Sequence, residues 1–324
     1  HATVLLLVRD AVLKIREQCW LAALPIVLLC SAEAALAAMQ AAAGQKPIEG
    51  FGTFVSYDHF AGLVEMGVPF AAVFPFAILG HRERGEPIGG LPAILAGTSA
   101  ILAVVMLSGI VVAQSRGGYL ATIAGLLVAG VLALFAGGSG QTGKMPIGKI
   151  LVGVVAVVLL GAVLFFFLQS DELRTRFAET GDLRNEGRLQ MWKDTTRLIA
   201  DYPIFGCGFG AFESCYQRYQ TGAIFSTIDY AHNDYLQVMA ELGLLAFVVG
   251  LVFIGRIVQR AIRGVFRTRL LQERYLLAAA VGAMSAMLVH SLVDFNMYMA
   301  GNAMTFAWIA GLGAMQAGQP RSRR

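Results

Sequence analysis

A histidine stands at the edge of a long apolar run in this sequence. His232 precedes the stretch "NDYLQVMAELGLLAFVVGLVFIG", in which a polar beginning gives way to hydrocarbon side chains. A neutral imidazole near pH 7 can accept a proton from a hydroxyl group, and Asp229, Asp234 and Tyr235 are close enough in the chain to orient the ring. The pattern favours His232 as a general base, although a helix-capping or interface histidine would fit the same position.

Two apolar runs meet at Arg116 in "VVAQSRGGYLATIAGLLVAG", with almost no loop between them. Such a guanidinium stays at the depth of the lipid headgroups, where a charge is costly unless it is paired. Arginine binds phosphate with a planar fork of donors, and Gly117 and Gly118 allow close approach of a ligand to the backbone. We therefore predict that Arg116 binds phosphate; the alternative is that its side chain snorkels to the headgroups.

A further basic ridge is predicted in "DLRNEGRLQMWKDTTRLIADYP". Asn185 is a suitable N-cap, and the helix that follows should run to about residue 201, where a proline ends it. Arg184, Arg188 and Trp192 recur at steps of four residues and therefore lie on one ridge. Arg188 is a second candidate phosphate ligand, and the alternative is an amphipathic helix that contacts water or headgroups.

Other polar residues also stand at the ends of apolar runs. His59 and Glu65 flank one in "YDHFAGLVEM", while His290 and Asp294 lie one helical turn apart. Singly, such residues are more often hydrogen-bonded interior groups. Glu241 falls on a different helix face from His232 and roughly 13 Å deeper, so we predict a structural role for it. The residues predicted to contact a substrate are His59, Asn233, Tyr235, Arg184, Trp192 and Asp294.

The elements that position these residues follow from composition. The 324 residues are 57% hydrophobic and 14% charged, whereas soluble domains carry about 25% charged residues. The apolar residues come in runs near the length that crosses a bilayer core of about 30 Å. We predict an all-α, polytopic membrane protein with spans at residues 19–40, 60–79, 91–113, 117–136, 149–168, 234–256, 274–292 and 302–318.

One long polar segment, residues 169–233, is too long for a plain connector and has helix signals of its own. It divides the chain into N-terminal spans (1–168), a loop domain (169–233) and C-terminal spans (234–324). Cys207 and Cys215 share this segment, and the sequence leaves open whether they form a disulfide. The opening "HATVLLLV" is typical of the tail of a truncated helix, so we expect the N-terminus to be incomplete.

The distribution of basic residues predicts which loops face the cytoplasm. Short loops on one side carry most of them, for example the five arginines between residues 256 and 269, and the opposite loops carry little more than Lys46 and Arg116. The positive-inside rule places the basic set in the cytoplasm and the long segment outside. The net charge of +4 therefore reflects topology and not nucleic-acid binding. The histidines, arginines and Asp294 singled out above then gather at the outer face, and the Cys and His spacings suggest no metal site.

Five stretches, taken together and in order, resemble the bacterial O-antigen ligase and polymerase superfamily. They are "GTFVSYDHFAGLVEM", "SRGGYLA", "NEGRLQMWKDTTRLIADYPIFGCGFGAF", "AHNDYLQVMAELGLL" and "HSLVDFNMYMAGNA". The resemblance covers most of the chain from about residue 50. It implies a multi-pass protein of the bacterial inner membrane with a large periplasmic loop and a GT-C-like glycosyltransferase fold. The family's functional residues match Arg116, Arg188 and His232, while Tyr57 and Asp58 stand where arginine and asparagine are frequent.

The resemblance also implies the reaction. The donor would be a glycan on undecaprenyl diphosphate and the acceptor a hydroxyl, with neither metal nor other cofactor. Ligases transfer to the lipid A core, polymerases to another lipid-linked repeat, and some relatives to protein. Arg116 and Arg188 would neutralise the departing diphosphate at low dielectric, and His232 would deprotonate the acceptor, with inversion at the anomeric carbon. We favour an O-antigen ligase whose site faces the periplasm. A polymerase is the alternative, and a lipid or sugar transporter, which should show internal repeats, is a more distant one.

Overall fold

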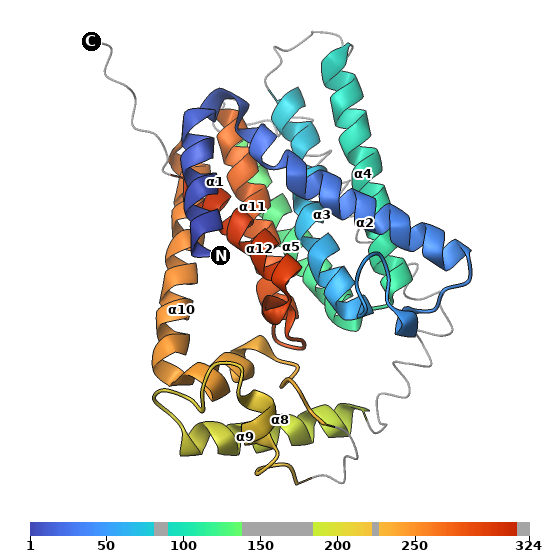
Figure 1. Cartoon of the computed structure of the whole chain (residues 1–324). Helices are drawn as coiled ribbons and strands as arrows, with labels where there is room; N and C mark the ends of the chain where they lie inside the picture. Colours follow the sequence, from blue (N-terminus) through green and yellow to red (C-terminus); the bar gives the residue numbers. More distant parts are fainter. Residues whose placement is uncertain (81–89, 138–183, 222–226, 316–324) are drawn as a thin grey trace.

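The computed structural model describes residues 1–80, 90–137, 184–221 and 227–315, without the side chains of residues 16 and 184–186. All regular elements in these ranges are helices (Figure 1). They are α1 (Ala2–Lys14), η1 (Arg16–Ala22), α2 (Leu24–Ala42), η2 (Pro47–Glu49), α3 (Tyr57–Leu79), α4 (Leu91–Ala113), α5 (Arg116–Ala136), α8 (Arg184–Asp201), α9 (Phe212–Tyr216), α10 (Asp234–Arg267), α11 (Leu271–His290), η4 (Asn296–Tyr298) and α12 (Ala300–Gly313).

The prediction of an all-α, polytopic membrane protein is confirmed. Within the described ranges, five helical stretches are long and apolar enough to cross a membrane: Glu17–Ala42, Tyr57–Leu79, Leu91–Ala113, Arg116–Ala136 and Asp234–Arg267. The predicted span 149–168 lies outside the described residues. The charged end of α10, with Arg256 and Arg267, lies at the opposite end of that helix from Asp234.

The helices at the last two predicted spans, α11 and α12, are not among these five stretches. Length and composition exclude them: α12 has 14 residues, and the first turn of α11 carries the polar residues Gln272, Glu273 and Arg274. The helix α11 packs against α3, α5, α10 and α12 in the middle of the bundle. Small side chains let it approach α5 closely: a Cβ on Gly125 would lie 2.8 Å from Cβ of Ala286, and one on Gly282 would lie 2.6 Å from Cβ of Ala129. A helix screened from lipid by its neighbours needs small side chains more than strongly apolar ones.

The long helix α10 is interrupted at Gly243, whose φ is 78° and ψ is 174°. The loop after α8 fills this break. The amide of Leu244 donates to the carbonyl of Pro203 (2.8 Å), and the amide of Cys207 donates to the carbonyl of Ala240 (2.9 Å). The first turns of α10 are therefore a separate arm before the span, whereas the sequence predicted one unbroken helix from residue 234.

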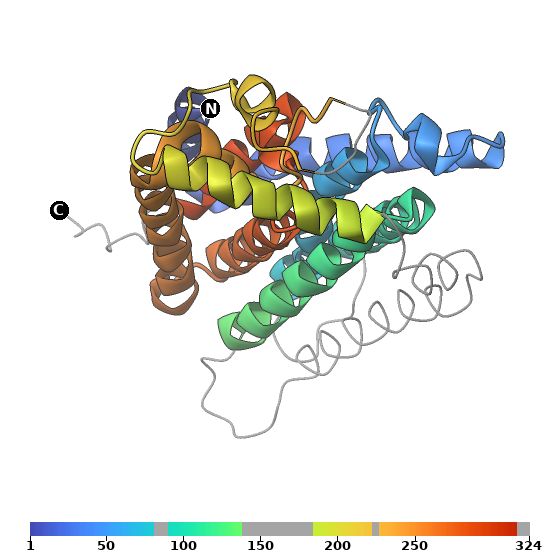
Figure 2. The ribbon, with the colours of Figure 1, turned by 90° about the horizontal axis from the view of Figure 1, so that it is seen from below.

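The described part of the predicted loop domain lies together at one end of the bundle (Figure 1). Seen from that end, α8 crosses the bundle with α9 beside it (Figure 2). This layer has a small apolar core of its own, formed by Met191, Leu198, Phe212, Tyr216, Ala231 and Ala240. Cys207 and Cys215, both free thiols, pack against that core, and burial and the neighbouring Cys215 raise the pKa of Cys207 to about 12.

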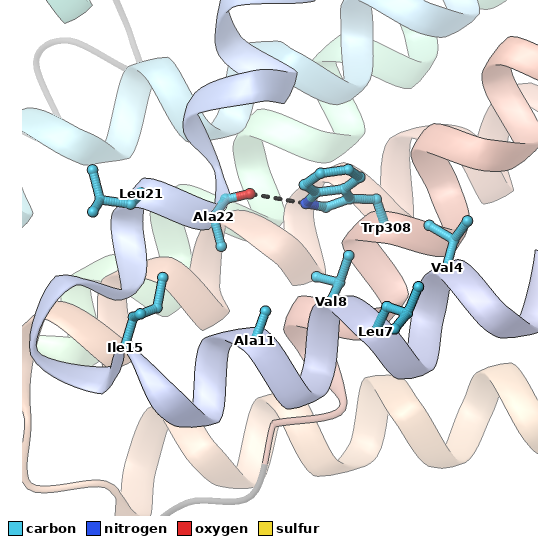
Figure 3. Close-up of a pocket in the computed structure, with 8 residues that line it drawn as sticks. All are labelled: Val4, Leu7, Val8, Ala11, Ile15, Leu21, Ala22 and Trp308. Carbon is cyan, nitrogen blue, oxygen red and sulfur yellow. Dashed lines mark hydrogen bonds between the residues drawn. The ribbon is translucent and has the colours of Figure 1, made fainter.

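An apolar pocket of about 390 Å³ lies between α1, η1 and α12. The indole N–H of Trp308 donates to the carbonyl of Ala22 at 2.8 Å beside it (Figure 3). Val4, Val8 and Ala11 of α1 form one wall. The lining is hydrocarbon apart from the indole, and the pocket offers no group that could take part in acid–base chemistry.

Candidate functional site

The predicted site residues meet at a short loop, residues 291–295, that joins the end of α11 to η4. The loop is held to the first turn of α10. The amide of Asp234 donates to the carbonyls of Ser291 (2.9 Å) and Asp294 (3.1 Å), and the Asp234 carboxylate accepts from the Ser291 hydroxyl (2.7 Å) and from the amide of Met297 (3.1 Å). These bonds hold the loop in place. We call residues 291–295 the floor of the site, because side chains from other elements converge on them.

His232 contacts this floor through Asp294. Nδ1 of the ring lies 3.1 Å from Oδ1 of Asp294, and the His232 side chain is 39% exposed whereas that of Asp294 is 3% exposed. The carboxylate also accepts from the amide of Phe295 at 2.9 Å. A carboxylate at Nδ1 keeps the proton on that nitrogen and leaves Nε2 as a proton acceptor. Such an arrangement can serve as an oriented general base.

The backbone of His232 is in the left-handed region, with φ of 47°, which residues other than glycine seldom adopt. Its neighbours hold it there. The amide of Ala231 donates to Oε1 of Gln237 (2.7 Å), Oδ1 of Asn233 caps α10 by accepting from Leu236 (3.0 Å), and Nδ2 of Asn233 donates to the carbonyl of Leu292 (2.8 Å). Strain of this kind is often found at functional sites, where surrounding contacts impose it.

Arg188 reaches the same floor from α8. Its Nη1 donates to the carbonyl of Val293 at 3.1 Å, and that residue is the direct neighbour of Asp294. Trp192, one turn further along α8, donates its indole N–H to the carbonyl of Ala231 at 2.9 Å. The ridge predicted for Arg188 and Trp192 thus faces the site and ties α8 to the residue before His232.

Arg116 begins α5, whose first turn lies against the floor. The helix is capped by Ser115, whose Oγ accepts from the amide of Gly118 (3.0 Å) and donates to Oδ1 of Asp58 (2.6 Å). A Cβ on Gly117 would lie 2.7 Å from Nε2 of His290 and 2.9 Å from Cγ2 of Val293. The absence of a side chain at this glycine is what lets the start of α5 lie against the floor.

A buried ion pair supports the floor from within the bundle. Nδ1 of His290 lies 2.9 Å from Oε2 of Glu65, and their side chains are 1% and 0% exposed. Glu65 is on α3 and His290 ends α11, so the pair joins two helices at the level of the site. His59, also on α3, places Nε2 at 3.8 Å from Oδ2 of Asp294 and packs edge-on against Phe295 at 4.6 Å between ring centroids.

These contacts set the charge of Asp294. Burial by itself would raise the pKa of the carboxyl group, but the hydrogen bond to His232 and the nearby rings of His59 and His290 outweigh burial. The pKa of Asp294 therefore lies below its ordinary range. The carboxylate stays ionised and can stabilise an imidazolium on His232 as it forms.

A cavity of about 300 Å³ opens beside His232. Its other lining residues are Met191, Thr227, Ile228, Asp229, Tyr230 and Phe295. Tyr230 stacks on Phe295 with ring centroids 4.1 Å apart and planes 7° from parallel. The sequence did not single out Tyr230 or Phe295. The signal available was that Tyr230 lies two positions before His232 and that Phe295 directly follows Asp294.

The ligand atoms of Asp58, His290 and Asp294 lie within 4.8 Å of one another, a spacing that could hold a metal ion. Each already has a hydrogen-bonding partner: Ser115 for Asp58, Glu65 for His290 and His232 for Asp294. The three groups are therefore engaged in the hydrogen-bond network that joins α3, α5 and α11.

The structure brings Arg188, His232 and His59 to the loop that carries Asp294, and the residue after Arg116, Gly117, packs on the same loop. Asn233, Trp192 and Tyr235, predicted to contact substrate, donate instead to main-chain carbonyls; the Tyr235 hydroxyl bonds to Leu288 at 2.7 Å. The Arg184 side chain lies outside the described part of the chain. Asp229 lines the cavity and Asp234 holds the floor. Asp294, from the loop after α11, therefore takes the orienting position that was expected for them from the sequence.

Glu241 is buried and bonded as expected of a structural residue. Oε2 accepts from the Tyr298 hydroxyl at 2.9 Å, and Oε1 accepts from Nε2 of Gln237 at 3.0 Å. It lies before the break at Gly243, within the arm that packs on α8 and α9. The break thus separates Glu241 from the long part of α10.

Residues 101–250 match the model of the family described as O-antigen ligase. The matched range runs from within α4 into α10 and includes Arg116, Arg188 and His232. No curated protein matches the chain. The family match confirms the resemblance found in the sequence and supports a glycosyltransferase of the ligase or polymerase type. Over residues 101–250, the chain is thus similar to the O-antigen ligase family.

Proposed function

We propose that this protein transfers a glycan from undecaprenyl diphosphate to a hydroxyl of the lipid A core, at the periplasmic face of the bacterial inner membrane. One observation carries the proposal: Arg188 bonds to Val293, His232 bonds to Asp294, and Gly117, next to Arg116, packs on Val293. A cation, a base and the residue next to a second cation, from three separate parts of the chain, thus meet at two consecutive residues.

In the proposed reaction the acceptor oxygen attacks the anomeric carbon of the donor sugar. Nε2 of His232 accepts the hydroxyl proton, while Nδ1 keeps its hydrogen bond to Asp294. The bond between the anomeric carbon and the phosphate oxygen breaks, and the electron pair leaves with the lipid diphosphate. Attack from the face opposite the leaving group inverts the anomeric centre.

The two arginines would stabilise the diphosphate as its charge increases. One N–H group of Arg188 donates to the carbonyl of Val293 and thereby orients the guanidinium. A guanidinium carries five N–H donors in all. Arg116 stands at the N-terminus of α5, where the helix dipole also favours an anion. Preorganised donors at such a site contribute about 2.7–4 kcal/mol each to the transition state. Because arginines would do this, the proposed mechanism uses no metal ion.

The cavity beside His232 is a suitable place for the acceptor sugar. It lies between α8 and the segment that leads to His232, and it combines the Asp229 carboxylate with the Tyr230 and Phe295 rings. Carboxylates accept from sugar hydroxyls, and aromatic rings pack against the apolar faces of sugars. A polymerase would use the same donor chemistry and differ in the acceptor, so it is the second candidate.

The proposal is tested by glycan analysis of a strain in which the gene is deleted. Loss of the glycan from the lipid A core, with the polymer still present on the carrier lipid, is the result expected of a ligase. Single repeats without long chains would identify a polymerase instead. Return of the glycan on complementation with the native gene, but not with Arg116→Ala, Arg188→Ala or His232→Ala expressed to the same level, is expected. Normal transfer by all three variants would reject the mechanism.

A further inference from the structure

The loop between α8 and α9 exposes large apolar side chains. Ile204 is 58% exposed, and Phe205 and Phe209 are each 76% exposed. The sequence from Tyr202 to Phe212, "YPIFGCGFGAF", contains no charged residue. Large exposed apolar side chains grouped in one loop mark a surface that contacts another protein, a ligand or a membrane.

Main-chain hydrogen bonds keep the side chains of this loop exposed. The amide of Leu244 donates to Pro203 (2.8 Å), that of Cys207 to Ala240 (2.9 Å) and that of Gly208 to Glu241 (2.9 Å), all across the break in α10. A Cβ on Gly206 would overlap the main chain of Glu241. The loop is pinned at both sides of its tip, so Ile204 and Phe205 cannot turn inward without breaking these bonds.

The patch continues a surface that already faces lipid. Directly after the break, α10 exposes Leu244 (50%) and Leu245 (56%), and the apolar exposure goes on through Val248, Val249, Leu251, Val252 and Phe253. Because the amide of Leu244 is bonded to Pro203, the tip of the loop begins where the apolar surface of the span begins. In a bilayer this level is the boundary between hydrocarbon and headgroups.

We propose that Ile204, Phe205 and Phe209 enter the outer leaflet at that boundary and anchor the layer formed by α8 and α9 to the membrane. The partner is the lipid phase itself, since aromatic and aliphatic side chains without nearby charges suit this depth. The anchor adjoins the end of α8, the helix that carries Arg188, and so holds that arginine at the depth of lipid headgroups. The proposal stands on the membrane fold and does not depend on the transfer reaction.

The test uses the full-length protein in vesicles of phosphatidylethanolamine and phosphatidylglycerol, with or without bromine on the acyl chains. Tryptophan is introduced by Phe205→Trp, and the quenching of the added emission by bromine is compared with that of Gln217→Trp, an exposed polar position after α9. Both positions are exposed, so both variants should fold, which circular dichroism and gel filtration check. The native Trp20, Trp192 and Trp308 give the same background in both.

The added emission of Phe205→Trp should be quenched by bromolipid, more by bromine near the headgroup than near the chain end, and shielded from aqueous iodide. That of Gln217→Trp should show the reverse. Equal bromolipid quenching in the two variants would overturn the proposal. So would shielding of Phe205→Trp from both quenchers, because a second protein copy would then cover the patch. Glycan transfer is not measured, so this result is separate from a failure of the proposed function.

Discussion

Nδ1 of His232 lies 3.1 Å from Oδ1 of Asp294, although the two residues are 62 positions apart in the chain. His232 stands just before α10 and Asp294 just after α11, so the bond joins two helices at the same end of the bundle. The carboxylate is buried and the imidazole half-exposed. The bond thus directs the free nitrogen of the ring towards the cavity beside it, and this orientation is the basis of the first two predictions.

Replacement of His232 should remove the general base. A general base contributes about 10²- to 10⁴-fold to the rate, and we expect a loss of kcat of that order. His232→Asn is the sharper variant, because asparagine tolerates the left-handed backbone that His232 adopts. The measurement is single-turnover transfer with purified donor and acceptor in vesicles. If His232→Asn kept more than about a tenth of the native rate, the ring would not be the base.

Asp294→Asn should lower the rate less than loss of His232, and it should change the pH dependence of stability. The pKa of Asp294 is below its ordinary range in the folded protein. A depressed pKa gives stability that is complete above the unfolded value, about 3.9, and is lost as the pH falls through the folded value.

The melting temperatures of the native protein and Asp294→Asn, measured from about pH 7 to pH 3, should therefore differ by a constant amount at neutral pH. The difference should narrow only below about pH 4. A gap that already closes between about pH 6 and pH 5 would contradict an ionised, stabilising carboxylate at this position.

Arg188→Lys and Arg116→Lys should be nearly as damaging as the alanine variants. Lysine keeps the charge but not the planar fork that binds phosphate oxygens in pairs, and loss of one such donor costs about 10²- to 10³-fold in kcat. Arg197→Lys is a matched control on the same helix, since that side chain is 61% exposed and contacts Asp194. Full activity of Arg188→Lys would mean that this residue acts only as a point charge.

Gly117→Ala should impair the site while a second glycine in the same helix tolerates the change. The new methyl group would overlap His290 and Val293, and overpacking of this kind costs about 1–3 kcal/mol. Gly130→Ala is the control, because nothing lies within 4 Å of its added Cβ. We expect lower kcat and a lower melting temperature for the first variant and near-native values for the second. Equal behaviour of the two would show that α5 does not need to touch the floor.

Gly243→Ala should destabilise the fold through the break in α10. Its φ of 78° and ψ of 174° fall in a region used almost only by glycine, which costs other residues about 1–3 kcal/mol. The added Cβ would also overlap the main chain of Ile204. Gly250→Ala, in the same helix with open space around it, should melt as the native protein does. A thermal melt in detergent compares them, and equal melting temperatures would argue against a fixed break.

Much of the site was visible in the sequence because single residues at the ends of apolar runs are easy to recognise. The positions of Arg116, His232 and Asp294 relative to those runs placed them at one face, and the structure gathers them there. The partner of His232 was not predictable, since Asp229 and Asp234 are nearer in the chain and nothing local favours a residue from another helix. The pairing of Glu65 with His290 is hidden for the same reason.

Contacts between distant segments also limit how well the sequence predicts the fold. Hydropathy predicted the long helices well, because a lipid-facing helix needs apolar side chains all along its length. It was least informative for α10, where a single glycine inside an apolar run is compatible with both a continuous and a broken helix. The break depends on main-chain bonds from Pro203 and Cys207, and such a contribution from another segment leaves no trace in local composition.

The two glycines that interlock the α8–α9 loop with α10 have a consequence for sequence divergence. A Cβ on Gly206 meets the main chain at Glu241, and a Cβ on Gly243 meets the main chain at Ile204. If only one of the two glycines is replaced, the other remains in a conformation that is needed only for the close approach of the loop to α10. Homologous chains should therefore keep both glycines or lose both together, and chains that lose them should carry an uninterrupted helix at this position.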